Sequence, residues 1–308
     1  MKNLFALFIA LGLGLAALVM AQGSKGPITV GSKIDTEGAV LCQMVKIVLE
    51  AGGFRVNDKC STGPTDVVRK ALISGEIDMY PEYTGTALGV FFKDDAGAQA
   101  VTRDAAKGFA KAKELDARNN IVWLNAAPAN NTWAIAVPRA LAQQNNLRTM
   151  ADFGRWVRGG GQVRLAASQE FVDRDDALKA FERVYNFKLR PNQLVILPGG
   201  NTTQTEQAAA RGTNGVNAAM AYGTDGGIAA LGLVALTDPQ GAVAVYQPAI
   251  TVRKQVLDRY PEIAGLINPV FAALNEATLS ALNADVAVNG KNPAEVARAF
   301  LRSKNFIK

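Results

Sequence analysis

Short continuous apolar runs alternate with stretches of periodic apolar positions along the first part of the chain. Residues 28–31 form a short apolar run that predicts a buried strand. Residues 54–56 and 77–80 predict two more strands, with a helix between them over residues 65–73. Between the first two strands, apolar side chains recur with the 3.6-residue period of one helix face: Val40, Leu41, Met44, Val45 and Val48. This alternation of strands and helices predicts a parallel sheet with crossover helices.

Polar side chains mark where these helices begin. Asp35 and Thr36 stand before the first helix, and Thr65 or Asp66 is expected to cap the second. These residue types accept a hydrogen bond from the free N–H groups of a helix start. Gly52 follows the first helix and is expected to end it.

The same pattern continues through the rest of the chain. A long helix is expected over residues 98–118 and a strand over residues 121–124. Further strands are expected at residues 133–137, 163–167, 193–197 and 218–222, with helices at residues 141–146, 175–184 and 203–211. One strand and three helices follow residue 246. Two α/β units without a long linker predict two lobes with a ligand between them. We expect residues 26–130 and 246–308 to form the first lobe and residues 131–245 the second.

The first residues have the features of a secretory signal. Lys2 precedes an apolar run over residues 4–21, and small residues stand at its end. We expect residues 1–21 to be a signal peptide that is cleaved after about Ala21, so that the mature protein is periplasmic. The alternative is an uncleaved membrane anchor, because a run of 18 residues is close to the length of a membrane span.

Composition excludes several classes of enzyme. The chain has 308 residues with 49% hydrophobic and 19% charged residues, which is typical of a folded protein. It contains no histidine, so imidazole acid–base catalysis, histidine-dependent nucleophiles and histidine metal ligands are excluded. The net charge of +6 is spread over the chain without basic runs, which makes nucleic acid a poor partner. The composition leaves two classes open: a binding protein, or an enzyme that works with carboxylates, lysine or a bound cofactor.

Two cysteines, Cys42 and Cys60, are separated by 18 residues. In an oxidising compartment an isolated pair of this kind indicates a disulfide. A loop of this length corresponds to roughly 3 kcal/mol in the chain-entropy model. Two buried free thiols are the alternative.

Motifs spread over the whole chain resemble those of one family. They lie at residues 31–37 (Gly-Ser-Lys-Ile-Asp-Thr-Glu), 75–86, 127–133, 167–171 and 217–226. Together they resemble the periplasmic quaternary-amine binding proteins of ABC importers, which take glycine betaine, choline or carnitine, and most of all their osmotically induced, low-affinity branch. The resemblance implies a type II periplasmic binding protein fold, in which two α/β lobes close on the ligand by a hinge motion. It also implies a monomer without a cofactor that delivers its ligand to a permease in the membrane.

The resemblance implies an aromatic cage for the ligand's cationic head, at positions Tyr83, Trp133, Tyr222 and Tyr246. A quaternary ammonium cannot donate a hydrogen bond, so aromatic faces must attract it, each contributing roughly 0.5–2 kcal/mol. Relatives usually have tyrosine where this chain has Trp133. From the residues alone, Trp133 opens a strand and is more typical of a core side chain, and Tyr246 is typical of a core or surface side chain.

The opposite end of the site needs groups that hold a carboxylate. By resemblance these are Lys33, Thr86 and Arg174, and arginine can clasp a carboxylate with two N–H groups. Asn131 stands where some relatives carry an acid that favours the cation. The alternative for Arg174 is pairing with its acidic neighbours Asp173, Asp175 and Asp176.

Taken together, the sequence predicts a non-enzymatic receptor that captures a quaternary-amine osmolyte for an ABC importer. One alternative is a receptor for another cationic or zwitterionic solute, given Trp133 and Asn131. The other is an envelope protein without a role in transport. A receptor gains thermal stability from its ligand and an envelope protein does not.

Overall fold

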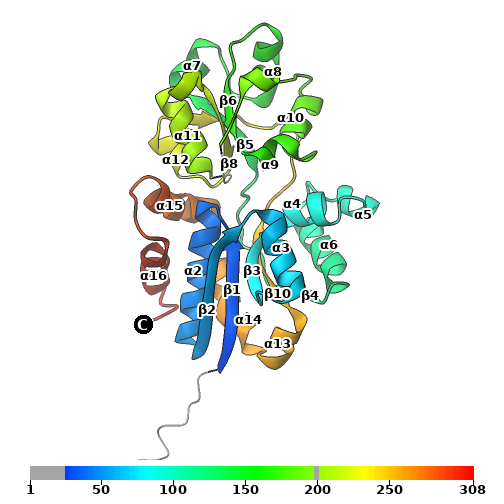
Figure 1. Cartoon of the computed structure of the whole chain (residues 1–308), viewed down its shortest axis with the longest axis vertical. Helices are drawn as coiled ribbons and strands as arrows, with labels where there is room; N and C mark the ends of the chain where they lie inside the picture. The colour runs from blue at the N-terminus through cyan, green and yellow to red at the C-terminus, as the bar shows by residue number, and fades with distance from the viewer. Residues whose placement is uncertain (1–24, 198–200) are drawn as a thin grey trace, which may run out of the picture.

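The computed structural model contains two five-stranded sheets, one above the other in Figure 1. The structure describes residues 25–197 and 201–308, so the predicted signal peptide lies outside the described residues. Within that part of the chain, no helix is both long and apolar enough to cross a membrane.

The first sheet has the strand order β2-β1-β3-β10-β4. Its strands are β1 (Lys25–Lys33), β2 (Phe54–Gly63), β3 (Met79–Tyr83), β4 (Ile121–Trp123) and β10 (Pro248–Arg253). β1 is parallel to both β2 and β3, which confirms the predicted parallel run. β10 enters between β3 and β4 and is antiparallel to both, so the complete sheet is mixed.

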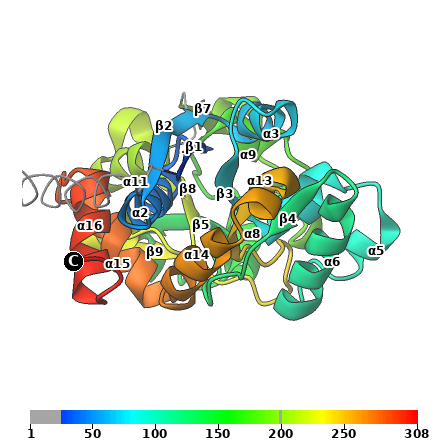
Figure 2. The same cartoon turned by 90° about the horizontal axis from the view of Figure 1, so that it is seen from below.

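Helices cover both faces of this sheet. They are α2 (Thr36–Ala51), α3 (Thr65–Ser74), α4 (Thr84–Thr86), the π-helical turn η1 (Ala87–Phe91), α5 (Ala96–Gln99), α6 (Ala105–Ala117), α13 (Lys254–Arg259), α14 (Glu262–Ala272), α15 (Glu276–Ala287) and α16 (Pro293–Ser303). The apolar side of α2 packs with β1, α14 and α16 into one core, as its 3.6-residue period predicts. α3 and α6 bury their apolar residues in two smaller clusters with β3 and β4. Figure 2 shows α2 and α16 on one side of the molecule and α6 on the other.

Three predictions in this lobe are wrong. The long helix over residues 98–118 is two helices, because Asp104 accepts a hydrogen bond from the N–H of Lys107 and begins α6 there. α3 follows Pro64 without a side-chain cap, so neither Thr65 nor Asp66 caps it. Four helices, rather than three, follow β10. The cap of α2 is Asp35, which accepts from the N–H of Gly38 at 2.7 Å.

A disulfide joins Cys42 on α2 to Cys60 on β2, which confirms the predicted pairing. The two Cα atoms are 5.8 Å apart, within the usual range for a disulfide. The bond ties the central helix of the first lobe to the edge strand of its sheet.

The second sheet has the order β7-β6-β8-β5-β9. Its strands are β5 (Trp133–Pro138), β6 (Leu165–Ala167), β7 (Leu194–Ile196), β8 (Ala218–Tyr222) and β9 (Leu233–Ala235). β6 is parallel to β7 and β8, while β5 is antiparallel to β8 and β9. Around it lie α7 (Arg139–Gln144), α8 (Met150–Arg158), α9 (Gln169–Asp173), α10 (Leu178–Val184), η2 (Pro191–Gln193), α11 (Thr202–Arg211), η4 (Thr213–Gly215) and α12 (Gly227–Ala230).

The side chains of β5 are large on one face of this sheet and small on the other, and different helices cover the two faces. Trp133, Ile135 and Val137 point to the face covered by α8, α9 and α10. Ala134 and Ala136 point to the opposite face, where α11 packs in an alanine-rich cluster. Successive side chains of a strand point to opposite faces, so this one strand serves both layers. The helices α8, α9 and α12 and the strand β9 were not predicted.

The chain passes between the sheets twice. It leaves the first sheet after β4 and returns to it before β10. Thr84 and Thr132 bind these crossing segments, since their hydroxyls donate to the carbonyl oxygens of Val245 at 3.0 Å and Ala244 at 2.8 Å. The ends of β3, β5 and β8 therefore meet near the place where the lobes join.

Candidate functional site

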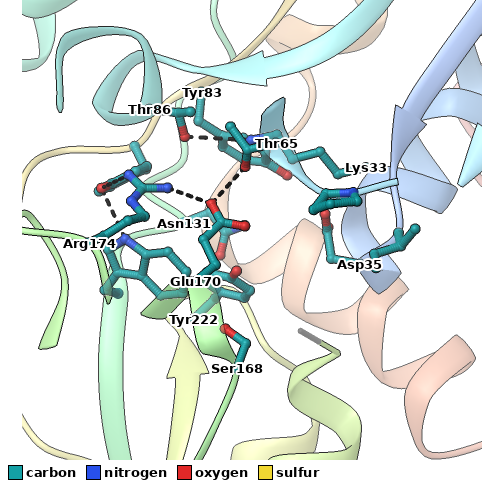
Figure 3. A pocket seen from close by; sticks show the side chains of 14 residues that line it. Lys33, Asp35, Thr65, Tyr83, Thr86, Asn131, Ser168, Glu170, Arg174 and Tyr222 are labelled. Carbon is teal, nitrogen blue, oxygen red and sulfur yellow. Dashed lines mark hydrogen bonds and ion pairs between the residues drawn. The ribbon is translucent and has the colours of Figure 1, made fainter. Parts of the chain in front are cut away.

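A pocket lies between the two lobes, at the ends of β3, β5 and β8 (Figure 3). All eight side chains that the sequence predicts for ligand binding line it: Lys33, Tyr83, Thr86, Asn131, Trp133, Arg174, Tyr222 and Tyr246. They come from β1, the β3–α4 junction, β5, β8, the end of α9 and both segments that cross between the lobes. The structure thus brings together residues that are up to 213 positions apart in the sequence.

Strand pairing places two of the aromatic side chains side by side. Trp133 begins β5 and is the direct partner of Tyr222 at the end of β8. Their ring centroids are 4.6 Å apart and the rings are tilted by 36°. Tyr246 meets Trp133 edge to face, with centroids 6.3 Å apart. This arrangement presents aromatic rings of different orientation to one small space.

Two features fix the position of Tyr246: hydrogen bonds to its hydroxyl, and close packing of its ring against Gly85. Its hydroxyl accepts from Trp133 Nε1 at 3.0 Å and donates to Asp176 Oδ2 at 2.9 Å. Gly85 lies against the ring, and a Cβ at this position would stand 2.7 Å from three ring atoms. Only glycine lets the backbone approach this closely.

The tyrosine hydroxyls of the pocket remain protonated. Burial raises the pKa of Tyr83, Tyr222 and Tyr246 well above the ordinary value of tyrosine. Neutral rings with an electron-rich face attract cations. Two cations of the protein already occupy such positions, since Lys33 Nζ lies 4.8 Å from the Tyr83 ring centroid and Arg174 Cζ lies 5.4 Å from that of Trp133.

Lys33 is paired with a carboxylate that the sequence analysis left without a role. Glu82 is fully buried behind the pocket, and its Oε1 accepts from Lys33 Nζ at 2.6 Å. The same carboxylate accepts from the Tyr83 backbone N–H at 2.7 Å and from the Tyr80 hydroxyl at 2.8 Å. Thr86 Oγ1 lies 3.5 Å from Lys33 Nζ. Glu82 therefore orients Lys33 and offsets its charge.

Arg174 is also engaged by acids. Its Nε and Nη2 donate to the two oxygens of Asp176 at 2.8 and 2.6 Å, and its Nη1 donates to Glu170 at 2.9 Å. Nη2 donates a second time, to the Tyr246 hydroxyl at 3.1 Å. Within the described part of the chain, four of the five N–H groups of the guanidinium thus have partners. Asp176 pairs with Arg174, as the alternative stated above expects.

Asn131 adds an unpaired acceptor to the pocket wall. It is almost fully buried, and its Oδ1 has no hydrogen-bond partner among the described residues. An amide oxygen carries partial negative charge. Beside a cation, this oxygen would act as a weak electrostatic partner.

Six further side chains line the pocket that the sequence analysis did not assign to it: Ile34, Asp35, Pro64, Thr65, Ser168 and Glu170. Asp35 and Ser168 cap helices beside the pocket, so their residue types indicated only a structural role. Glu170 Oε1 accepts from Thr65 Oγ1 at 2.8 Å as well as from Arg174, so it joins the two lobes (Figure 3). In the sequence, only the position of Glu170 in the motif at residues 167–171 indicated that it could belong to the site.

Comparison with known proteins identifies the family. The model of the substrate-binding domain of ABC-type glycine betaine transport systems matches residues 26–303. The chain belongs to this family. It is 50% identical, over 96% of either chain, to the glycine betaine-binding protein YehZ of Escherichia coli. It is 30% identical to a glycine-betaine-binding protein of Pseudomonas aeruginosa, over 96% of this chain and 92% of that one.

Solved structures agree with the fold. The structure of apo YehZ from E. coli covers 92% of this chain and the whole of its own, with a TM-score of 0.68. A glycine betaine/carnitine/choline ABC transporter structure, 20% identical, covers 91% of this chain and all of its own with a TM-score of 0.71. The family confirms the type II fold that the sequence predicts. This member of the glycine betaine transport family is the binding component of a transporter and not an enzyme.

Proposed function

We propose that this protein captures a quaternary-amine osmolyte such as glycine betaine and delivers it to the permease of its ABC importer. The observation that carries the proposal is the convergence of Tyr83, Trp133, Tyr222 and Tyr246 on one pocket that also holds Lys33. The relatives described above are named for glycine betaine, which supports the same ligand class here.

The trimethylammonium head binds against the aromatic faces around Trp133, where the unpartnered oxygen of Asn131 adds partial negative charge. The carboxylate tail binds Lys33, Thr86 and the remaining N–H of Arg174. The head is attracted by its charge and the tail by hydrogen bonds, so the pocket distinguishes the two ends of the ligand.

The lobes consist of residues 26–130 with 246–308 and residues 131–245, and they close on the ligand by rotation about the two crossing segments. Contacts such as that of Thr65 with Glu170 form when the lobes approach. The affinity then equals the gain in the closed state less the free energy of closing.

The contacts already made inside this pocket favour a low affinity for the ligand. Glu82 and Asp176 already pair with Lys33 and Arg174, so a ligand carboxylate must compete with them. The ligand head must likewise displace the Lys33 ammonium and the Arg174 guanidinium from aromatic faces. These competing pairs support our proposal that the protein belongs to the osmotically induced, low-affinity branch of its family.

The protein acts in the periplasm as a monomer after cleavage near Ala21. The Cys42–Cys60 disulfide supports an oxidising compartment. Mass spectrometry of the protein purified from the periplasm tests this directly: the expected N-terminus is Gln22, and a retained leader would show an anchored protein instead.

Titration calorimetry with glycine betaine, choline, carnitine and proline betaine tests the proposed function, with amino acids as controls. A saturable signal for one or more quaternary amines, together with a rise in melting temperature, is expected. A panel without binding at millimolar concentrations would refute the proposal.

A choline-like cation is the second candidate. Two cations, Lys33 and Arg174, face four carboxylates in or directly behind the pocket wall: Asp35, Glu82, Glu170 and Asp176. A surplus of negative charge favours a ligand that has a cationic head and no carboxylate. The same calorimetry decides between the two.

A further inference from the structure

We infer that Glu37 is a positioning residue that links closure of the two lobes to the orientation of Tyr83 in the pocket. The inference rests on the proposed function, because it assigns Tyr83 to the ligand site. Glu37 itself does not line the pocket.

Three elements donate hydrogen bonds to the Glu37 carboxylate. Oε1 accepts from the Tyr83 hydroxyl at 2.9 Å, at the end of β3. Oε2 accepts from the Thr224 hydroxyl at 2.5 Å and from Asn283 Nδ2 on α15 at 2.8 Å. The side chain is only 3% exposed. One oxygen thus orients a pocket tyrosine and the other binds the junction between the lobes.

Thr224 belongs to the second lobe, whereas Glu37, Tyr83 and Asn283 belong to the first. Asn283 Nδ2 also donates to the Thr224 carbonyl oxygen at 3.0 Å, so α15 and α2 hold the same residue of the opposite lobe. Figure 1 shows α15 directly below the second lobe, beside α2.

Close packing surrounds this bridge. A Cβ on Gly226 would stand 2.4 Å from the Ala284 Cβ and from the Ser280 carbonyl oxygen of α15. The second lobe can therefore approach α15 this closely only because position 226 has no side chain. When the lobes separate, Glu37 loses Thr224, the neighbouring backbone moves away, and water reaches the carboxylate.

An acidic residue in the first turn of a helix has a simpler explanation, since negative charge there interacts favourably with the helix dipole. That explanation accounts for a solvent-exposed carboxylate. It does not account for a buried one whose three donors come from β3, from α15 and from the opposite lobe.

Burial raises the pKa of Glu37 from 4.5 to about 7, against the opposing effect of its hydrogen bonds from Thr224 and Asn283. The ionisable groups that face it are Asp35 on its own turn, Tyr83 from β3 and Asp225 beside Thr224, while α15 contributes the neutral amide of Asn283. In separated lobes the carboxyl group is solvated and its pKa returns toward 4.5. Closure therefore takes up a proton between about pH 4.5 and 7.

The difference in the pKa of Glu37 between the open and closed states sets the direction in which pH changes the stability of the closed state. A carboxyl group whose pKa is higher in the closed state stabilises that state most at low pH, and the contribution is lost as the pH rises through about 7. The affinity for glycine betaine should consequently rise roughly tenfold between pH 8 and pH 6.

Calorimetry at the two pH values on three variants tests the inference. Glu37→Gln keeps an acceptor oxygen for Thr224 and cannot ionise, so its affinity should change less than twofold between the two pH values. Thr224→Val removes the donor from the second lobe, and Tyr83→Phe keeps the ring but releases it from Glu37. Both should weaken binding about fivefold to tenfold, and combining either with Glu37→Ala, which removes the acceptor, should cost little more than Glu37→Ala alone.

Glu182→Gln is the matched control. Glu182 is another buried acid, it accepts from Lys188 and the Leu189 N–H, and all three residues lie in the second lobe. This variant should keep the wild-type response to pH. Circular dichroism of each variant distinguishes a local effect from unfolding.

Small-angle scattering of the ligand-free protein tests the bridge separately from the ligand. At pH 6, where protonation of Glu37 favours closure of the ligand-free protein, Thr224→Val and Glu37→Ala should have a larger radius of gyration than the wild type, and Glu37→Gln should not. Glu37→Gln with the full tenfold pH response, or Glu37→Ala with wild-type affinity and size, would overturn the inference. Absence of amine binding by the wild type would instead refute the proposed function, and scattering would still decide whether Glu37 holds the lobes together.

Discussion

Arg174→Met should convert the site toward ligands without a carboxylate. Methionine keeps much of the unbranched apolar stem of arginine and its packing against Trp133, while it removes the charge and all five N–H groups. Arg174 lies 5.4 Å from the Trp133 ring centroid and pairs with Asp176 and Glu170. The substitution therefore changes both ends of the proposed ligand.

The structure gives the size of each effect. The described residues leave one N–H of Arg174 for a ligand carboxylate, and a hydrogen bond between charged groups contributes about 1.5–3 kcal/mol. Loss of the guanidinium also removes a positive charge near the cage, but this effect acts on the ammonium head of glycine betaine and choline alike. It cancels in the ratio of the two affinities, which should shift toward choline by about tenfold to a hundredfold.

Titration calorimetry of both ligands against the wild type and the variant measures this ratio. Arg158→Met is the control, because Arg158 is exposed on α8 and donates to the carbonyl oxygens of Tyr185 and Asn186 in the second lobe. It should leave the ratio unchanged. If Arg174→Met weakens both ligands by the same factor, Arg174 supports packing or closure and the carboxylate binds elsewhere.

Three further outcomes follow from other parts of the structure. Trp133→Leu should reduce the preference for glycine betaine over 3,3-dimethylbutanoate, its analogue with carbon in place of nitrogen, by about 0.5–2 kcal/mol; proportional loss for both ligands by calorimetry would indicate packing alone. Arg69→Met should lower the free energy of unfolding by about 3–5 kcal/mol in urea, because Asp116 is fully buried and loses its ion pair; a change under 1 kcal/mol would contradict this. Replacing both Cys42 and Cys60 by alanine should cost about 3 kcal/mol in the same assay, from the 18-residue loop that the disulfide closes, and wild-type protein unfolded under reducing conditions should show the same loss.

Local signals predicted most of the first lobe correctly. The periodicity around Val40 and the Asp35 cap fixed the position of α2, because both depend on neighbouring residues alone. The break between α5 and α6 was missed, although Val101, Thr102 and Asp104 at the break are weaker helix formers than the alanine residues on either side of it. Thr149 and Asp152 form a capping box at the start of α8, and this signal was present in the sequence without being used.

The residues of the site could be named from motifs, but their pairing could not. Trp133 and Tyr222 become neighbours only because β5 runs antiparallel to β8 in the second sheet. Glu82 stands among apolar residues in a buried strand, and no periodicity indicates that it faces Lys33. Such contacts depend on how distant segments dock, which a single sequence does not specify.

Gly85 offers a way to separate capture of the ligand from recognition of the membrane complex. A methyl group at this position would clash with the ring of Tyr246 and displace it from its place in the pocket wall. Gly85 is itself buried, so the outer surfaces of both lobes would keep their chemistry. A protein altered only at Gly85 would therefore be a decoy, empty yet recognisable to the importer, and its competition with the unaltered receptor during uptake would measure docking alone.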